Sequence, residues 1–542
     1  MFVKEWISDL KKEFKGYNKQ KFSKDVMAGL TVTAVALPLA LAFGVSSGAD
    51  AASGLITAIL SGLIMSLLAG AFYQISGPTG AMSAILLSLV AKLGLQGVFL
   101  AGALAGIFLI LAGIFKLGKL TAFIPMPVIT GFTSGIAIII AMGQIDNFFG
   151  TTSMGETAIQ KLISYGSLGF SPDIITTIIG ICTVLFMIFF PKKWSKVVPS
   201  SLLAIILSTA ICMLFSIPTA TVGSIPTTLL PETRLLFSEI DISKLKAVIA
   251  PAISIALLGM IESLLCGASA GRMTGVRLKS DRELIAQGIG NFIVPFFGGV
   301  PSTAAIARTS VAIKSGAQTR LTGVIHGLGL LFSMLFLAPV MSNIPMASLA
   351  GILMVTAFRM NEWSAIKQFF SGKFKSSIAK YLVTMVATVA FDLTIAIVIG
   401  IALALVLLVS KLSQLKIAYD TVHTERLGDN AILKEEYKNT LVCYITGPLL
   451  FANADMIDSI FDHAKNSNTL LLSMRAVPQM DISAGNALYD LVVALQKKGI
   501  KVLFCGVSED LMTMMERMKI DSLVGKDAYY WSATQALAKE NN

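Results

Sequence analysis

Long runs of apolar residues, separated by short polar connections, follow one another from about residue 26 to residue 413. A helix that crosses a membrane needs roughly 20 apolar residues and a half-helix needs fewer, so this pattern predicts about 14 helical segments. They are expected at residues 26–47, 54–71, 78–92, 97–116, 121–142, 172–191, 199–217, 246–270, 283–297, 302–314, 319–340, 345–360, 381–394 and 395–413. The pattern is typical of a polytopic α-helical membrane protein.

The pattern changes near Lys411, where the apolar runs become short and alternate with amphipathic stretches. This alternation predicts a small α/β domain. Its predicted strands are 440–446, 469–474 and 500–505, and its predicted helices are 455–465, 484–498 and 509–518. We therefore expect an N-terminal lead-in at 1–24, a transmembrane domain at 25–415 and a soluble domain at 416–542.

The composition agrees with this division. Apolar residues make up 55% of the chain, charged residues 14%, and the mean hydropathy is +0.76, which excludes an ordinary soluble globular protein. The 43 Lys and Arg against 32 Asp and Glu give a net charge of +11. Because the tail from residue 416 is mildly acidic, the basic excess belongs to the membrane part. There it indicates loop orientation, and we expect no nucleic-acid partner.

Basic residues in the connecting loops predict the orientation in the membrane. Lys and Arg concentrate at 192–196, 272–282 and 359–380, whereas the loop 143–172 has Lys161 as its only basic residue. Basic loops remain on the cytoplasmic side, so both termini are expected in the cytoplasm and the protein in the plasma or inner membrane. The first 24 residues carry seven lysines without an apolar run, which argues against a cleavable signal peptide.

Two apolar segments open on the same chemistry, Gly77–Ala81 (GPTGA) and Val300–Ala304 (VPSTA). Proline ends an arriving helix but suits the first turn of a new one, so each segment predicts a half-helix that begins within the membrane. Unpaired N–H groups at such a start attract anions. These are the third and tenth of the fourteen segments, which predicts a seven-plus-seven inverted repeat with the two half-helix starts facing each other.

Glu262 stands in an uncharged stretch from Ala247 to Gly271. At a rise of 1.5 Å per residue, ten residues from Arg272 place its carboxyl ~15 Å into a ~30 Å membrane core. An ionisable group at that depth is a functional candidate, either to hold a coupling cation or to take up a proton, which burial assists. The alternative is a carboxylate neutralised by a structural partner.

Arg308 is the only cation between Pro301 and Ile313, six residues after Ser302 on the same predicted half-helix. A guanidinium behind an anion-attracting helix start would complete a site for a carboxylate or a sulfate-like oxyanion. In the alternative interpretation, Arg308 pairs with Glu262 or extends to the membrane interface.

Further candidates are hydroxyl donors at the two starts and an aromatic side chain beyond a predicted kink at Pro38. They are Thr79, Ser302, Thr303 and Phe43. Hydroxyl groups often form hydrogen bonds between membrane helices, and a lone Phe often packs in the protein interior. These residues are therefore functional candidates only together with Glu262 and Arg308. The five Cys and three His show no metal-ligand spacing, and no phosphate loop or catalytic motif occurs. We expect no metal, no cofactor and no enzymatic activity.

Five stretches together resemble the sulfate permease (SulP) family of anion transporters, and the resemblance covers essentially the whole chain. They are Ala28–Pro38, Ile75–Gly80 (ISGPTG), Leu258–Cys266 (LGMIESLLC), Glu283–Asn291 (ELIAQGIGN) and Phe296–Thr309 (FFGGVPSTAAIART). The runs around Glu262 and Arg308 are most similar to the bacterial branch that includes a C4-dicarboxylate transporter.

The resemblance implies a transport domain with core and gate subdomains, a cytoplasmic STAS domain, a homodimer and an elevator-like movement of the core. It places the bound anion beside seven residues and the coupling ion at Glu262, where family members carry Asp or Glu and Glu favours protons over sodium. The seven residues are Phe43, Thr79, Gly80, Ser302, Thr303, Ala304 and Arg308, of which Ser302, Thr303 and Ala304 contribute their backbone.

Two departures from the family pattern affect these expectations. Arg272 replaces an acidic residue that many relatives carry after the Glu262 run, which changes the local charge balance. In the tail, Asp481–Gly485 (DISAG) is similar to the phosphorylation loop of anti-anti-sigma factors, but Ile482 occupies the phosphoacceptor position. We expect no phosphorylation switch at Ile482; Ser483 is either an alternative acceptor or, in the favoured interpretation, a helix N-cap.

Three classes of function remain open. The leading hypothesis is a secondary active transporter of a small oxyanion (sulfate, bicarbonate or a C4-dicarboxylate) coupled to protons or sodium. A passive anion channel or exchanger is the second, and it would not need a titratable group at Glu262. The third is a membrane sensor that signals through the STAS domain. The packing that sets the pocket size, and with it the anion, is not encoded in any local pattern.

Overall fold

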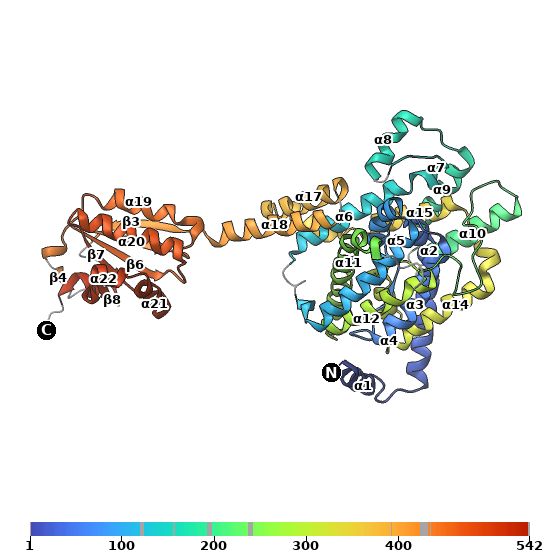
Figure 1. Cartoon of the computed structure of the whole chain (residues 1–542), viewed down its shortest axis with the longest axis horizontal. Helices are drawn as coiled ribbons and strands as arrows, with labels where there is room; N and C mark the ends of the chain where they lie inside the picture. Colours follow the sequence, from blue (N-terminus) through green and yellow to red (C-terminus); the bar gives the residue numbers. More distant parts are fainter. Residues whose placement is uncertain are drawn as a thin grey trace. The chain divides into compact units, whose positions relative to one another are not determined.

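The chain forms two compact units, Met1–Ile401 and Ala402–Asn542 (Figure 1). The computed structural model describes residues 2–119, 124–155, 158–191, 194, 198–236, 242–391, 393–422, 432–433 and 435–539. The basic stretch predicted at 192–196 lies outside these residues except for Trp194. The first unit is almost entirely helical, and the second contains a five-stranded sheet.

Each of the fourteen predicted apolar segments contains helix, and among the described residues seven helices are long and apolar enough to cross a membrane. The third and fourth predicted segments fall within one assigned helix, α5 (Gly80–Ile114). That helix breaks at Gly94, whose φ of 67° is a conformation that suits glycine. A polytopic helical membrane fold is thus confirmed, while the inverted repeat stays a prediction.

Helices of the first unit pack in two groups. The first helix group joins α5 to α11 and α12, and α2 to α3, α13 and α14. Its bounds are α2 (Lys19–Ser46), α3 (Ala51–Leu60), α4 (Ser66–Leu68), α11 (Ile242–Thr274), α12 (Ser280–Ile293), α13 (Ile306–Lys314) and α14 (Leu321–Met341).

The second helix group joins α6 to α15 and α17, and α9 to α10 and α15. Its bounds are α6 (Met126–Gly143), α7 (Ile145–Phe149), α8 (Ala158–Leu168), α9 (Ile174–Phe189), α10 (Ser200–Leu214), α15 (Met346–Met360), α16 (Trp363–Ser371) and α17 (Lys375–Ala390). Helix α18 (Leu393–Leu412) leads from the first unit into the second. The two groups touch through α5 with α6 and through α2 with α10 and α15.

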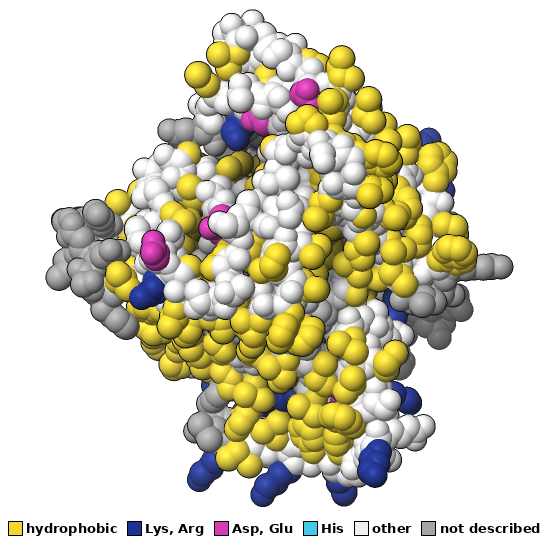
Figure 2. All heavy atoms as spheres, turned by 90° about the vertical axis from the view of Figure 1, so that its right-hand side faces the viewer, with side chains coloured by type: hydrophobic (Ala, Val, Ile, Leu, Met, Phe, Trp, Pro, Cys, Tyr) yellow, Lys and Arg dark blue, Asp and Glu magenta, His cyan; other side chains and the backbone are white. Residues whose placement is uncertain are grey.

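The surface has the character expected of a membrane protein. In Figure 2, hydrophobic side chains cover much of the visible face, and Lys and Arg side chains gather at its lower end, the end at which α1 (Phe2–Glu13) lies in Figure 1. Large apolar side chains such as Phe189, Leu214 and Phe336 are 77%, 79% and 64% exposed. Apolar exposure on this scale requires a lipid environment.

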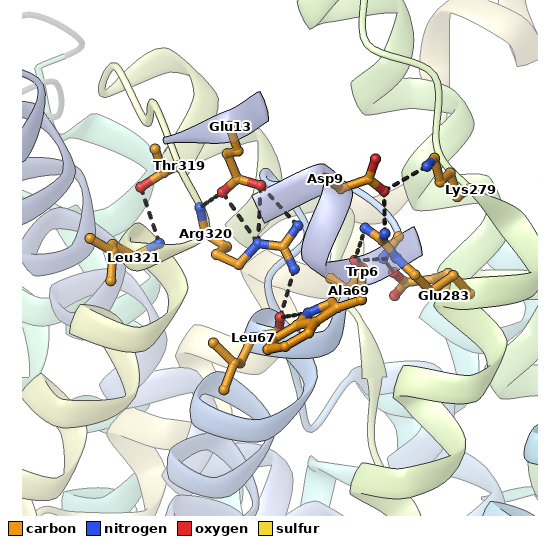
Figure 3. A network of polar contacts seen from close by, with 12 residues as sticks. Trp6, Asp9, Glu13, Leu67, Ala69, Lys279, Glu283, Thr319, Arg320 and Leu321 are labelled. Carbon is orange, nitrogen blue, oxygen red and sulfur yellow. Dashed lines mark hydrogen bonds and ion pairs between the residues drawn. The ribbon is translucent and has the colours of Figure 1, made fainter. Parts of the chain in front are cut away.

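The N-terminal helix α1 is bound to the first helix group by its acidic side chains (Figure 3). Glu13 accepts hydrogen bonds from the backbone N–H and the guanidinium of Arg320, and Asp9 pairs with Lys279 and Arg282. Arg282 and Arg320 also donate to carbonyls at the end of α4, whose last residues have no intrahelical partner. The lead-in is therefore a docked helix.

The second unit is built on a sheet with strand order β3-β5-β6-β7-β8. Its strands are β3 (Lys416–Thr421), β5 (Thr440–Thr446), β6 (Thr469–Ala476), β7 (Lys501–Cys505) and β8 (Tyr529–Tyr530). Only β3 is antiparallel to its neighbour. A separate pair joins β4 (Ile432–Leu433) to β9 (Ala538–Lys539). The three predicted strands are confirmed, and the two edge strands β3 and β8 are additions.

Five helices accompany this sheet. They are α19 (Asp455–Ala464), α20 (Ile482–Lys497), α21 (Glu509–Arg517), α22 (Ile520–Val524) and α23 (Ala533–Leu537). Cys443, Leu472 and Phe504 lie side by side on three neighbouring strands, and all are fully buried. Burial raises the pKa of the Cys443 thiol to about 12, so it stays protonated and acts as a small apolar residue.

The loop that resembles a phosphorylation site differs from expectation in one detail. The N-cap of α20 is Asp481, which accepts a hydrogen bond from the Ala484 N–H, and not Ser483. Ser483 lies one residue inside the helix and is exposed. Ile482, at the phosphoacceptor position, is 68% exposed. An aspartate caps as well as a serine, so the interpretation of Ser483 as the cap was wrong.

Candidate functional site

The two interrupted segments meet inside the first helix group. Strand β1 (Ser76–Gly77) pairs antiparallel with β2 (Thr303–Ala304), with Ser76 opposite Ala304 and Gly77 opposite Thr303. Helix α5 begins three residues after β1, and α13 begins two residues after β2. Two segments more than 200 residues apart therefore cross at one buried place, and a helix follows each of them.

The prolines play a different part from the one predicted. Pro78 lies two residues before the first helical residue of α5, and Pro301 lies five residues before the start of α13. Neither is in a first helical turn, so that prediction was wrong. The fixed φ of proline also suits extended chain, which both segments adopt before their helices begin. The N-cap of α5 is Thr79, whose hydroxyl accepts from the Met82 N–H at 3.4 Å.

Polar side chains from neighbouring helices form hydrogen bonds with the non-helical backbone of the second interrupted segment, Val300–Ala304. Asn291 donates to the Ser302 carbonyl at 2.9 Å and accepts from the Ser302 N–H at 2.7 Å. Thr57 makes a similar pair of bonds with the backbone of Val300. Non-helical backbone within a membrane must be satisfied by protein in this way. Sequence reasoning missed Asn291 and Thr57, although an Asn in an apolar helix is an unusual residue.

Ser302 is consequently engaged on all sides. Both of its backbone groups bind Asn291, and its fully buried hydroxyl lies 3.6 Å from Met65 Sδ. Thr303 and Ala304 are also occupied, because the Thr303 hydroxyl is 2.8 Å from Ser263 Oγ, which accepts from the Ala304 N–H. These three residues fix the crossing in place, which sequence reasoning had treated as an open helix start.

Glu262 lies on α11 beside the first crossing segment. Its Oε2 accepts a hydrogen bond of 2.9 Å from the hydroxyl of Thr79, and the side chain is partly buried. The carboxyl therefore contacts the residue that caps α5. Among the described residues no ion pair joins Glu262 to Arg308, so that alternative does not describe this structure.

Arg308 is the third residue of α13 and is 1% exposed. Its Nη2 donates to the Pro78 carbonyl at 2.8 Å, whereas its buried Nη1 has no hydrogen-bond partner. A Cβ atom at Gly77 would overlap Nη1, so any larger residue there would force the guanidinium to shift. Arg308 does not extend to the protein surface, and it lies in the first turn of α13, which begins only at Ile306.

The start of α5 also touches the second helix group. A Cβ atom at Gly80 would overlap Ile140 Cδ1 of α6 and lie 3.2 Å from Phe43 Cε1 and 3.5 Å from Met360 Sδ. Phe43 is 5% exposed on α2, and its carbonyl accepts from Ser83 at 3.0 Å. Thus Phe43, Thr79, Gly80, Glu262 and Arg308 gather around one helix start. Ile140 and Met360 carry no signal in the sequence.

Within the described residues no cluster of three His, Cys, Asp or Glu side chains could hold a metal ion. The charged groups at the crossing are one carboxyl and one guanidinium, and the nearby polar groups are hydroxyls and amides. Such a set can recognise a small anion and exchange a proton or a monovalent cation.

Comparison with known proteins identifies the family. Residues 22–387 match the sulfate permease family and residues 431–532 match the STAS domain. YvdB of Bacillus subtilis, named as a sulfate transporter, is 36% identical over 95% of this chain and 97% of its own. The bicarbonate transporter BicA of Picosynechococcus sp. is 31% identical over 95% of this chain and 94% of its own.

Two solved structures share the fold. The transmembrane domain of a cyanobacterial bicarbonate transporter BicA matches with a TM-score of 0.64 at 32% identity, covering 72% of this chain and 98% of that one. SLC26A9 matches with a TM-score of 0.78 at 18% identity, covering 96% and 91% of the two chains, which shows the fold alone. The chain is therefore a multi-pass membrane protein that belongs to the sulfate permease family and carries a STAS domain.

Proposed function

We propose that the protein is a secondary active transporter of a small oxyanion, of the class of sulfate, bicarbonate or a C4-dicarboxylate. The anion would bind at the start of α5, beside Thr79, Gly80 and Phe43, with Arg308 supplying the positive charge. The relatives named for sulfate and bicarbonate transport support this substrate class. Because these relatives are named as transporters, we propose transport without chemical conversion.

One observation carries the proposal of coupling. Arg308 and Glu262 contact adjacent residues of one segment, the first through the Pro78 carbonyl and the second through the Thr79 hydroxyl. An anion at this helix start would be repelled by an ionised Glu262 in a setting of low dielectric. A proton or a sodium ion at Glu262 removes that repulsion. Binding of the anion and of the cation would thus favour each other, as symport requires.

A proton is the coupling ion that we favour. Glu262 receives a single hydrogen bond, from Thr79, and within the described residues it belongs to no group of three or more His, Cys, Asp or Glu side chains that could hold a metal ion. A sodium ion needs several oxygen ligands at once, whereas a buried carboxyl takes up a proton without further ligands.

The proposed movement is an elevator-like displacement of the first helix group, as the core, against the second, as the gate. Both segments of the crossing belong to the first group, so the site would travel with it as one body. We further propose a homodimer in the plasma or inner membrane with both termini in the cytoplasm. The basic end of the molecule in Figure 2 supports this orientation.

The test of coupling is Glu262→Gln in proteoliposomes of reconstituted protein. Under an inward proton gradient, and separately a sodium gradient, the unaltered protein should accumulate radiolabelled sulfate, bicarbonate, fumarate or succinate. Glu262→Gln should abolish accumulation of the anion against its own concentration gradient, because an amide cannot bind a proton reversibly. Exposed Glu232 supplies the matched control, Glu232→Gln. Undiminished uphill uptake by Glu262→Gln would disprove the coupling role and favour a channel.

A further inference from the structure

The contact between Gly80 and α6 links the candidate site to the second helix group. Gly80 is the first residue of α5, and the space beside its Cα is filled by the tip of Ile140. Phe43 and Met360 lie next to the same point, at 3.2 and 3.5 Å from the position that a Cβ atom would take. At this place, therefore, four residues from α2, α5, α6 and α15 converge.

The two sides of this contact differ in chemistry. The side of the first helix group carries the polar and charged groups, namely Thr79, Glu262 and Arg308. The side of the second group presents an aliphatic side chain, Ile140, and a thioether, Met360. Neither can donate a hydrogen bond to an anion. The second helix group thus limits the space at the candidate site and excludes water from it, whereas the first helix group supplies the charged side chains.

We propose that Ile140 and Met360 are specificity-determining residues that set the largest anion the site accepts. This inference rests on the proposed transport function. Ile140 is 5% exposed within α6, and its branched Cβ restricts χ1, so the side chain stays at this place and only its Cδ1 tip can turn. Met360 is the last residue of α15 and has an unbranched side chain, so it adapts to the bound anion.

The test measures uptake of anions of graded size in proteoliposomes. Ile140→Ala and Met360→Ala should raise the uptake of succinate relative to bicarbonate by about tenfold, the effect of a few methylene groups in an apolar pocket. Ile138→Ala and Met126→Ala are the controls. Both residues lie on α6, and they are 38% and 53% exposed on its outer surface. Equal shifts in the Ile140 and Ile138 variants would overturn the proposal.

A second experiment tests the contact without reference to transport. Gly80→Ala places a methyl group on Ile140 and should lower the melting temperature of the purified protein. Adding Ile140→Ala should restore it, whereas adding Ile138→Ala should not. Failure of this rescue would overturn the inference and leave the proposed function standing. Absence of uptake by the unaltered protein for every anion would instead refute the proposed function, and the size-limiting role with it.

Discussion

At the scale of single residues, one positive and one negative side chain contact adjacent residues just before α5. The Pro78 carbonyl accepts from Arg308, and the next side chain, Thr79, donates to Glu262. Because α5 begins directly after these two residues, a change in either charged group acts directly on the start of the helix. The unpartnered Nη1 of Arg308 adds a donor that the described protein leaves unsatisfied. A buried donor of this kind is costly unless another group binds it.

Replacement of Arg308 by Lys should separate charge from geometry. Lysine keeps the positive charge but lacks the planar fork that reaches the Pro78 carbonyl and keeps a second donor free. Loss of one charge-assisted hydrogen bond costs about 1.5–3 kcal/mol, so kcat/KM for uptake should fall by roughly 10- to 100-fold. Uptake of a labelled anion by proteoliposomes provides the measurement.

Arg272→Lys is the matched control, because Arg272 is exposed at the end of α11. It should leave uptake unchanged. If Arg308→Lys transported as well as the unaltered protein while both eluted as single species, the guanidinium would have no specific role at the site.

At the scale of secondary-structure elements, α1 has an unexpected part. It supplies the carboxylates for two arginines that are almost fully buried, Arg282 at 5% and Arg320 at 2% side-chain exposure. Trp6 adds a hydrogen bond from its indole N–H to the Leu67 carbonyl at 3.0 Å. Since all these partners belong to the first helix group, α1 is part of that group.

Removing the carboxylates of α1 should destabilise the first unit. In the double variant Asp9→Asn, Glu13→Gln, both buried arginines would lose the carboxylates to which they are hydrogen-bonded. Breaking a buried ion pair by removing one partner costs about 3–5 kcal/mol. The melting temperature of the purified protein should therefore fall, whereas Glu5→Gln on the exposed side of α1 should not change it. An unchanged melting temperature in the double variant would mean that α1 contributes no stability.

Docking of α1 should also depend on pH in a defined direction. Burial alone would raise the pKa of Asp9, but hydrogen bonds and charges from Lys279 and Arg282 lower it below its ordinary value. A carboxyl with a lowered folded pKa stabilises above its unfolded value, near ~3.9, and loses this contribution as the pH falls through the folded value. Fluorescence of Trp6, kept as the only tryptophan, should be constant at neutral pH and change below about pH 4.

At the scale of the whole molecule, the chain consists of two units with separate cores. The buried residues of the second unit form clusters that share no member with the cluster of the membrane unit. Each unit should consequently fold without the other. This independence also permits a test of the third functional class, a sensor that uses the STAS domain while the membrane unit does something else.

The isolated fragment 416–542 should fold as a soluble domain. Burial raises the pKa of Cys443 to about 12 and also raises that of Cys505, so both thiols should resist maleimide at pH 8 until a denaturant unfolds the fragment. The complementary fragment that ends at Leu415 should retain anion uptake. Rapid labelling of both thiols in the native fragment would show that the domain needs the membrane unit to fold.

Much of this architecture was predictable because it depends on local patterns. Apolar runs predicted the seven described helices that are long and apolar enough to cross a membrane, since a helix in lipid satisfies its own backbone and its position follows from hydropathy. Period and composition likewise predicted the central strands of the tail, while the short edge strand Tyr529–Tyr530 has no such signal. Glu262 and Arg308 were identifiable because charged residues are rare in apolar stretches.

The sequence by itself thus determined which segments lie in the membrane, where two of them are interrupted and which charged residues they carry. Only the tertiary structure decided which groups meet: Asn291 with Ser302, Glu13 with Arg320, and Ile140 with Gly80. Each pair joins distant parts of the chain, and its contact depends on how helices pack. Hydropathy is a property of a single segment and can be assessed residue by residue. Packing depends on the shapes of several segments together, so it cannot be predicted from any one of them.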